Sequence, residues 1–148
     1  MRGYFDKFFG EIGKTEAYKT VMKLQSYSGY VAFLDTFPKS EKRNDVVNEL
    51  KAFRIHIVDT NSREWISKQD MINSFGCQDT ARLYKWSDEM AGSVRVEGKM
   101  WSFGPLAIGN VEILQGSFAG ESRNGEEGFL FEKGSRLIYK APSATKAK

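Results

Sequence analysis

The chain has 148 residues, of which 41% are hydrophobic, 28% charged and 14% aromatic, and its formal net charge is +3. A chain of this length and composition buries a core without help from a cofactor, so a single globular domain is expected. Its one cysteine, Cys77, and one histidine, His56, exclude an intrachain disulfide and a multi-cysteine zinc site.

The sequence also carries no pattern typical of membrane insertion or export. Its longest apolar run, residues 30–34, is far shorter than the ~20 residues that span a bilayer. Charged residues interrupt the aromatic residues near the start of the chain, so no secretory signal is expected. We therefore predict a cytoplasmic protein without a membrane span.

Aromatic residues recur at helical spacing near the start of the chain, at Phe5, Phe8 and Phe9, with Ile12 following. Nearby glycines limit this segment to a short helix. The helix either packs on the body of its own chain or docks onto a partner, a membrane surface or a second copy. The three phenylalanines are accordingly candidate partner-binding residues.

The next elements follow from the spacing of apolar residues. A second helix begins at Thr15 and ends near Gly29. The β-favouring residues 30–37, which a proline follows, predict a strand. One apolar stripe over residues 45–53 predicts a helix, and the change to a two-residue period predicts a strand over 53–60.

Residues 67–103 contain the most informative pattern. Ser67 can cap a helix with Asp70 three residues later, and Gly76 can end that helix in a left-handed conformation. After a short turn, Asp79 begins a second predicted helix, whose apolar residues are Leu83, Trp86 and Met90. Gly98 then centres a predicted β-hairpin. A plain helical hairpin packed on a sheet explains the same residues.

This order of helix, turn, helix and hairpin resembles the winged helix-turn-helix DNA-binding domains over residues 67–103. The resemblance implies that the second helix enters the major groove and that the hairpin holds phosphates. It implies nucleic-acid contacts by Gln78, Thr80, Arg82, Lys85, Arg95 and Lys99.

From Ser93 onward, frequent glycines and a two-residue period predict strands. These strands cover residues 94–97, 99–103, 106–114, 129–132 and 136–140. A turn at residues 133–134 is expected to pair the last two, and the polar residues 122–128 are expected to form a mobile loop.

The predicted fold class is α+β. A helix-rich part over about residues 1–92, with one or two short strands, precedes a C-terminal antiparallel β-sheet of hairpins over about residues 93–140. Both parts are expected within one domain, residues 1–142, and residues 143–148 form a basic tail.

No pattern in the chain favours an enzyme. His56 alternates with Ile55 and Ile57, so on a strand it would face away from the apolar side, and Cys77 has no recognisable base. Adjacent carboxylates do not converge on one site, and no phosphate-binding loop or metal-ligand pattern is present. We expect no catalytic residue, no metal and no cofactor.

Two function classes remain. One is a DNA-binding or regulatory protein that uses the helix-turn-helix and the hairpin. The other is a small protein-binding, inhibitor or assembly subunit, such as an accessory protein or homo-oligomer, that acts through aromatic and β-sheet surfaces. DNA binding should weaken steeply with salt, whereas apolar protein contacts should be far less sensitive.

Overall fold

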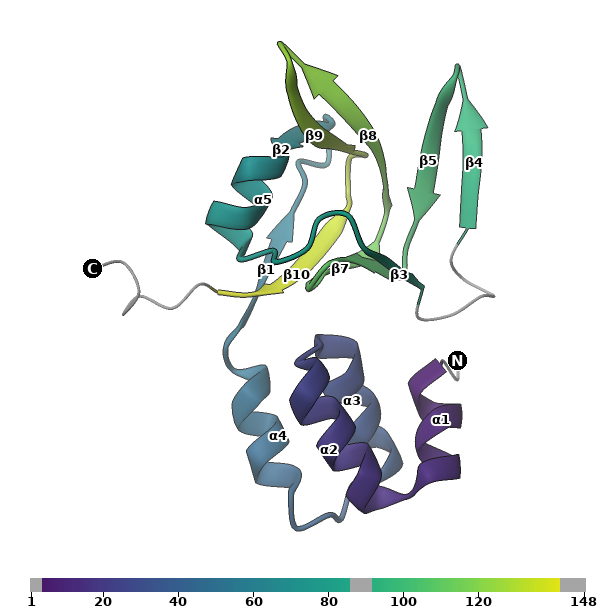
Figure 1. Cartoon of the computed structure of the whole chain (residues 1–148), viewed down its shortest axis with the longest axis vertical. Coiled ribbons are helices and arrows are strands. Elements are labelled where there is room, and N and C mark those ends of the chain that lie inside the picture. Colours follow the sequence, from purple (N-terminus) through teal and green to yellow (C-terminus); the bar gives the residue numbers. More distant parts are fainter. Residues whose placement is uncertain (1–3, 86–91, 142–148) are drawn as a thin grey trace, which may run out of the picture. The chain divides into compact units, whose positions relative to one another are not determined.

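The computed structural model describes residues 4–85 and 92–141, and it divides the chain into two compact units, Met1–Phe53 and Arg54–Lys148 (Figure 1). Helices make up the first unit, and two antiparallel sheets dominate the second. The predicted α+β class, with helices before strands, is confirmed. The strand predicted over residues 53–60 is also confirmed, because the first strand starts at Phe53.

The first unit consists of α1 (Tyr4–Ile12), α2 (Lys14–Leu24), α3 (Tyr27–Thr36) and α4 (Arg43–Leu50). Each helix contributes to the core, whose fully buried side chains include Phe9, Val21, Tyr30, Phe33 and Val46. The predicted helices near the start of the chain, after Thr15 and over residues 45–53 are therefore present. The second of them ends at Leu24 and not near Gly29, which lies within α3.

The strand predicted over residues 30–37 is wrong, because these residues continue α3. The Ser26 hydroxyl accepts a hydrogen bond from the Gly29 N–H at 2.9 Å and caps the helix. Tyr30 and Phe33, three positions apart, are both fully buried, and the Phe33 ring packs on Phe9. Tertiary packing of these rings outweighs the β-propensity of the segment.

The second unit contains two five-stranded sheets. The first sheet has the order β1 (Phe53–Ile57), β10 (Arg136–Lys140), β7 (Val111–Gln115), β6 (Leu106–Ile108) and β3 (Leu83–Lys85). The second sheet has the order β2 (Glu64–Ser67), β9 (Glu126–Phe131), β8 (Ser117–Arg123), β5 (Lys99–Phe103) and β4 (Gly92–Val96). One helix, α5 (Lys68–Phe75), follows β2 directly.

Side chains from both sheets and from α5 share one apolar core. Its buried members include Ile66, Met71, Phe75, Cys77, Leu106, Ile108, Val111, Ile113, Phe118, Phe131 and Leu137. We call the face of the second sheet that carries Phe118 and Phe131 the inner face, and the opposite face the outer face.

The ends of α5 match the sequence prediction. The Ser67 hydroxyl accepts a hydrogen bond from the Asp70 N–H at 3.0 Å, and Gly76 adopts a left-handed conformation with φ of 68°. Both signals act within one turn of the chain, so they do not depend on the rest of the fold.

The second helix predicted from Asp79 is wrong over the described residues. The Asp79 carboxylate accepts a hydrogen bond from the Ala81 N–H at 3.2 Å and forms a turn instead of a helix cap. Leu83 then pairs with Ile108, so residues 83–85 form β3 beside β6. The predicted helical residues Trp86 and Met90 lie outside the described ranges.

The predicted later strands are present, but β8 was not predicted and the connections between strands differ. The hairpin around Gly98 is confirmed, whereas Gly109, with φ of 58°, divides the predicted strand 106–114 into β6 and β7. Residues 122–128 were expected to form a loop, but they form a β8–β9 hairpin whose turn is Asn124 and Gly125. The last two strands do not pair, because β9 and β10 belong to different sheets.

Candidate functional site

The residues expected on a recognition helix lie instead on a turn and a strand. The four residues concerned come after α5 and are Gln78, Thr80, Arg82 and Lys85. The Gln78 N–H donates to Asn110 Oδ1 at 2.9 Å, and Arg82 forms an ion pair with Asp79 at 3.8 Å. These two contacts tie the turn to other residues of the second unit.

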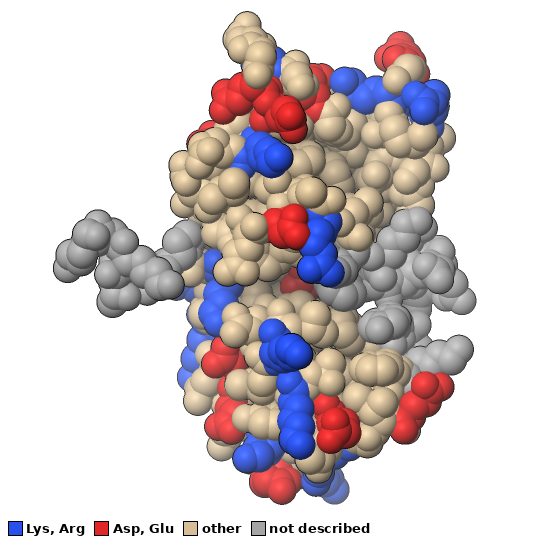
Figure 2. Space-filling view, viewed as in Figure 1, with Lys and Arg blue, Asp and Glu red and all other residues tan. Residues whose placement is uncertain are grey.

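The remaining two expected nucleic-acid contacts, Arg95 and Lys99, lie on the β4–β5 hairpin as predicted. Arg95 Nη1 donates to the Gly98 carbonyl oxygen at 3.2 Å, and Lys99 Nζ lies 3.0 Å from Glu121 Oε1. Because Lys99 pairs with Val96, the neighbour of Arg95, the two cations occupy opposite faces. Figure 2 shows Lys and Arg atoms near the tip of this hairpin and acidic atoms over the β8–β9 hairpin.

The candidate partner-binding residues of α1 are largely buried within the helical unit. Phe5 is 4% exposed and Phe9 is fully buried, and their ring centroids lie 5.6 Å apart. Phe8 is half-buried and lies 6.1 Å from Phe9. Packing on the same chain therefore accounts for Phe5 and Phe9.

The β4–β5 hairpin exposes large apolar side chains on its outer face. Val94, Val96 and Phe103 are 44%, 46% and 39% exposed. They share this face because Val94 pairs with Trp101 and because side chains alternate along each strand. Only two register pairs join β5 to β8, so the rest of the hairpin extends beyond the sheet.

A row of apolar residues continues from this hairpin across the outer face of the second sheet. Trp101 of β5 packs with Ala119 of β8 and Leu130 of β9, and Trp65 of β2 packs against the same cluster. Trp65 and Leu130 are register partners, as are Leu130 and Ala119. We call these four residues the outer strip.

Two arginines cover the tryptophans of the outer strip. The Arg63 guanidinium lies 4.9 Å from the Trp101 ring centroid, and that of Arg123 lies 5.4 Å from the Trp65 ring. Arg63 is held in place by two hydrogen bonds to the Glu132 carboxylate, at 3.1 and 3.2 Å. Trp101 is consequently only 6% exposed and is not available to stack on a base.

Ion pairs also offset the positive charge on the outer face. Lys99 and Arg123 both hydrogen-bond to Glu121 and thereby lower the pKa of that carboxyl group. Arg63 lowers the pKa of Glu132 in the same way. Each cation near the outer strip therefore has an anionic neighbour, which weakens attraction to phosphates.

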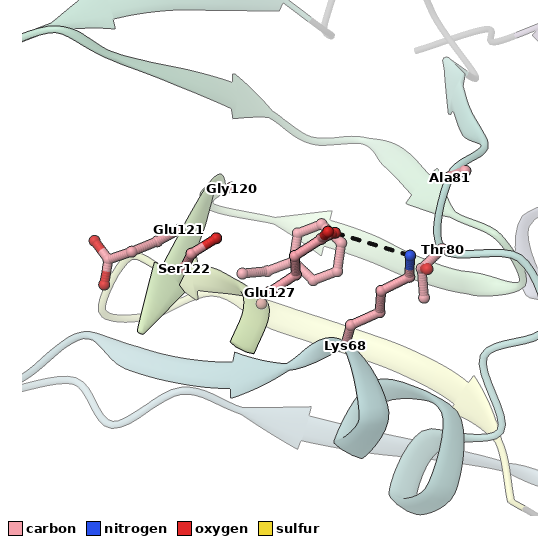
Figure 3. Close-up of a pocket in the computed structure, with 9 residues that line it drawn as sticks. Lys68, Thr80, Ala81, Gly120, Glu121, Ser122 and Glu127 are labelled. Carbon is pink, nitrogen blue, oxygen red and sulfur yellow. Dashed lines mark ion pairs between the residues drawn. The ribbon is translucent and has the colours of Figure 1, made fainter. Parts of the chain in front are cut away.

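A pocket of about 400 Å³ opens on the inner face of the second sheet. Gly120 and Phe129, a register pair on this face, form its floor. Lys68 of α5 lies at one side, and Thr80 comes from the turn before β3 (Figure 3). Thr80, one of the expected nucleic-acid residues, is thus among the residues that line this pocket. Glu121, whose backbone also lines it, directs its carboxylate away from the pocket.

The two residues considered for catalysis have structural partners. His56 Nε2 lies 3.0 Å from Glu64 Oε1 and its ring packs edge-on against Phe75, whereas Ile55 and Ile57 are 50% and 56% exposed. The predicted orientation of this strand is thus wrong. Cys77 donates its thiol to the Ile108 carbonyl oxygen, and burial raises the pKa of the thiol.

Within the described residues, no helix combines the length and apolar character needed to cross a membrane, and no group of three or more His, Cys, Asp or Glu side chains is arranged to hold a metal ion. No protein-family model matches the chain, and neither a curated protein nor a solved structure matches it significantly.

Sequence reasoning did not identify Val94, Val96 and Phe103 as an exposed apolar surface. Alternation along β4 and β5 is visible in the sequence, but it does not distinguish the buried Trp101 from the exposed Val94. That distinction depends on β8 and β9. Ala119 of β8 and Leu130 of β9 pack on Trp101 of β5, whereas β5 separates β4 from both of those strands.

Proposed function

We propose that the protein is a non-catalytic binding module that docks onto a protein partner through the outer face of its β4–β5 hairpin. The observation that carries this proposal is the cluster of three large, exposed apolar side chains, Val94, Val96 and Phe103, at the end of the second sheet. Exposed apolar clusters of this kind are typical of interaction surfaces.

Burial of these three side chains would add to the affinity for a partner. Fully burying a valine or phenylalanine side chain contributes about 1.5–3 kcal/mol. Because the three side chains are between 39% and 46% exposed, covering them would contribute roughly 3 kcal/mol in total. Such a gain corresponds to about a hundredfold in affinity.

The position of β4 favours an extended segment as the bound part of the partner. Among the described strands, β4 is the last in its sheet and pairs only with β5. Edge strands bind extended segments by main-chain hydrogen bonding, and alternate side chains then supply specificity. The matching partner is a strand with apolar side chains at alternate positions, which would contact Val94 and Val96.

Nucleic acid is a second candidate partner, supported by the place of Arg95 and Lys99 on the hairpin. Removing either phosphate contact would weaken binding to all sequences alike and lower the salt slope by roughly one unit. We rank it second because Lys99 already pairs with Glu121 and because the tip of the hairpin carries Glu97.

Site-specific crosslinking in a nuclease-treated host lysate tests the proposal. A photo-crosslinking amino acid at position 94 should give one discrete protein adduct that survives high salt, and the same probe at position 55 should not. Ile55 is a matched control because it is an exposed apolar residue on an edge strand of the other sheet. The adduct should disappear in a Val96→Thr, Phe103→Ser background.

Two results would overturn the proposal. One is an adduct of equal yield at position 55, which would make the capture non-specific. The other is recovery that nuclease abolishes and that falls steeply with salt, which would favour nucleic acid as the partner.

A further inference from the structure

The pocket on the inner face is separate from the hairpin surface and has its own chemistry. It lies where β8 and β9 continue past the apolar core, beyond the paired residues Phe118 and Phe131. The next register pair on the same face, Gly120 and Phe129, forms the floor. With a volume of about 400 Å³, the pocket falls within the range of small-molecule sites.

The floor offers a flat apolar surface with free space above it. Phe129 is half-buried, and its ring packs edge-on against Phe118 at 5.8 Å, which fixes its orientation. A Cβ atom added to Gly120 would have no neighbour within 4 Å. The glycine therefore leaves open space on the floor beside its register partner Phe129.

The rim carries hydrogen-bond donors and acceptors without a net charge. Lys68 Nζ and Glu127 Oε1 lie 3.9 Å apart, and their side chains are 47% and 78% exposed. That distance is longer than a hydrogen bond, so the Lys68 ammonium can still donate hydrogen bonds to a ligand and the Glu127 carboxylate can still accept them. The hydroxyls of Thr80 and Ser122 add groups that both donate and accept (Figure 3).

We infer that this pocket binds the pyranose ring of a neutral sugar. A pyranose has a flat C–H face that matches Phe129 and a rim of hydroxyls, each of which donates and accepts hydrogen bonds. Lys68 would donate to one hydroxyl and Glu127 would accept from another. A simple anion would meet Glu127, and a simple cation would meet Lys68, so neither suits the rim as well.

The open, exposed setting of the rim implies weak binding to a single sugar. Hydrogen bonds that compete with water contribute little, so the dissociation constant of a monosaccharide should be in the millimolar range. The pocket and the hairpin occupy opposite faces of the sheet, so this inference does not rest on the proposed protein partner.

Saturation-transfer NMR on the full chain tests the inference. The probes are glucose, galactose, mannose and N-acetylglucosamine, with free phenylalanine as a zwitterionic comparison. At least one sugar should receive transfer at its ring C–H protons. Gly120→Leu should abolish that transfer by filling the pocket. Gly92→Leu is the matched control, because the space around Gly92 on β4 is equally open but Gly92 does not line the pocket, and it should leave the transfer unchanged.

A second pair of variants examines the rim. Glu127→Ala and Lys68→Met should each weaken sugar binding by about tenfold, because each removes a hydrogen bond to a charged group. Both side chains are exposed, so folding should be preserved. The inference is wrong if no sugar receives transfer, if phenylalanine alone does, or if Gly120→Leu and Gly92→Leu behave alike.

Discussion

Two glycines on neighbouring strands should respond oppositely to the same substitution. A Cβ atom at Gly128 would lie 2.5 Å from Trp65 Cζ2 and 2.8 Å from the backbone oxygen of Ile66. A Cβ atom at Gly120 would have no neighbour within 4 Å. Gly128→Ala should therefore destabilise the fold, and Gly120→Ala should stabilise it.

The size of the Gly128 effect follows from how little its neighbours can move. The Ile66 oxygen belongs to β2, which pairs with β9, so it cannot retreat without disturbing the ladder. The Trp65 indole N–H donates to the Glu121 carbonyl oxygen at 2.9 Å, which holds the ring in place. Overpacking of this kind costs about 1–3 kcal/mol, and losing the indole hydrogen bond would add about 1 kcal/mol.

Gly120→Ala should instead raise the free energy of unfolding by about 0.4–1 kcal/mol, because it restricts the unfolded chain without straining the folded one. The pair is a matched comparison, since Gly120 and Gly128 lie on adjacent strands of the same hairpin. The two variants differ only in what the added methyl group meets.

Urea unfolding followed by tryptophan fluorescence measures both effects. All three tryptophans lie in the unit Arg54–Lys148, so the signal reports on that unit. A loss of 2 kcal/mol would lower the urea midpoint by about 1 M. Equal effects at the two glycines, or no loss of stability in Gly128→Ala, would refute the packing of Trp65 on β9.

Three further predictions concern other parts of the chain. Ser67→Ala should destabilise the second unit by about 1 kcal/mol in the same urea assay, because it removes the cap of α5. Burial and the nearby Glu49 carboxylate raise the pKa of Tyr30 to about 12. Since the unfolded chain then releases this proton first, stability should be complete below pH ~10 and fall by about 2–3 kcal/mol up to pH ~12. Circular dichroism should show this loss, and Tyr30→Phe should remove it; an unchanged alkaline profile would contradict the assignment. His56→Ala and Cys77→Ser should leave partner binding intact, and loss of binding in a folded His56→Ala variant would restore a functional role for the imidazole.

Signals that act within a few residues could be predicted from the sequence. Ser67 and Gly76 set the ends of α5, and Gly98 marks the β4–β5 turn, because caps and tight turns depend on local hydrogen bonds and on φ. Asn124 and Gly125 are a signal of the same kind, and they form the turn of a hairpin that the sequence analysis treated as a loop.

Elements that depend on distant partners could not be predicted in this way. Residues 30–36 favour strands locally, but the burial of Tyr30 and Phe33 among the other helices makes them helical. Residues 83–85 favour a helix by spacing, but pairing with β6 makes them a strand. In both segments the long-range contacts outweigh a weak local preference.

The sequence by itself thus determined the α+β class, the ends of α5 and the hairpin around Gly98, since each follows from local spacing or turn chemistry. Only the tertiary structure decided which residues meet at a surface. Strand register across β5, β8 and β9 buries Trp101 and leaves Val94 exposed, although both point to the same face. The pocket likewise requires Lys68, Thr80 and Phe129 to come from three separate elements. Register and sheet order join residues far apart in the chain, and no local pattern encodes those distances.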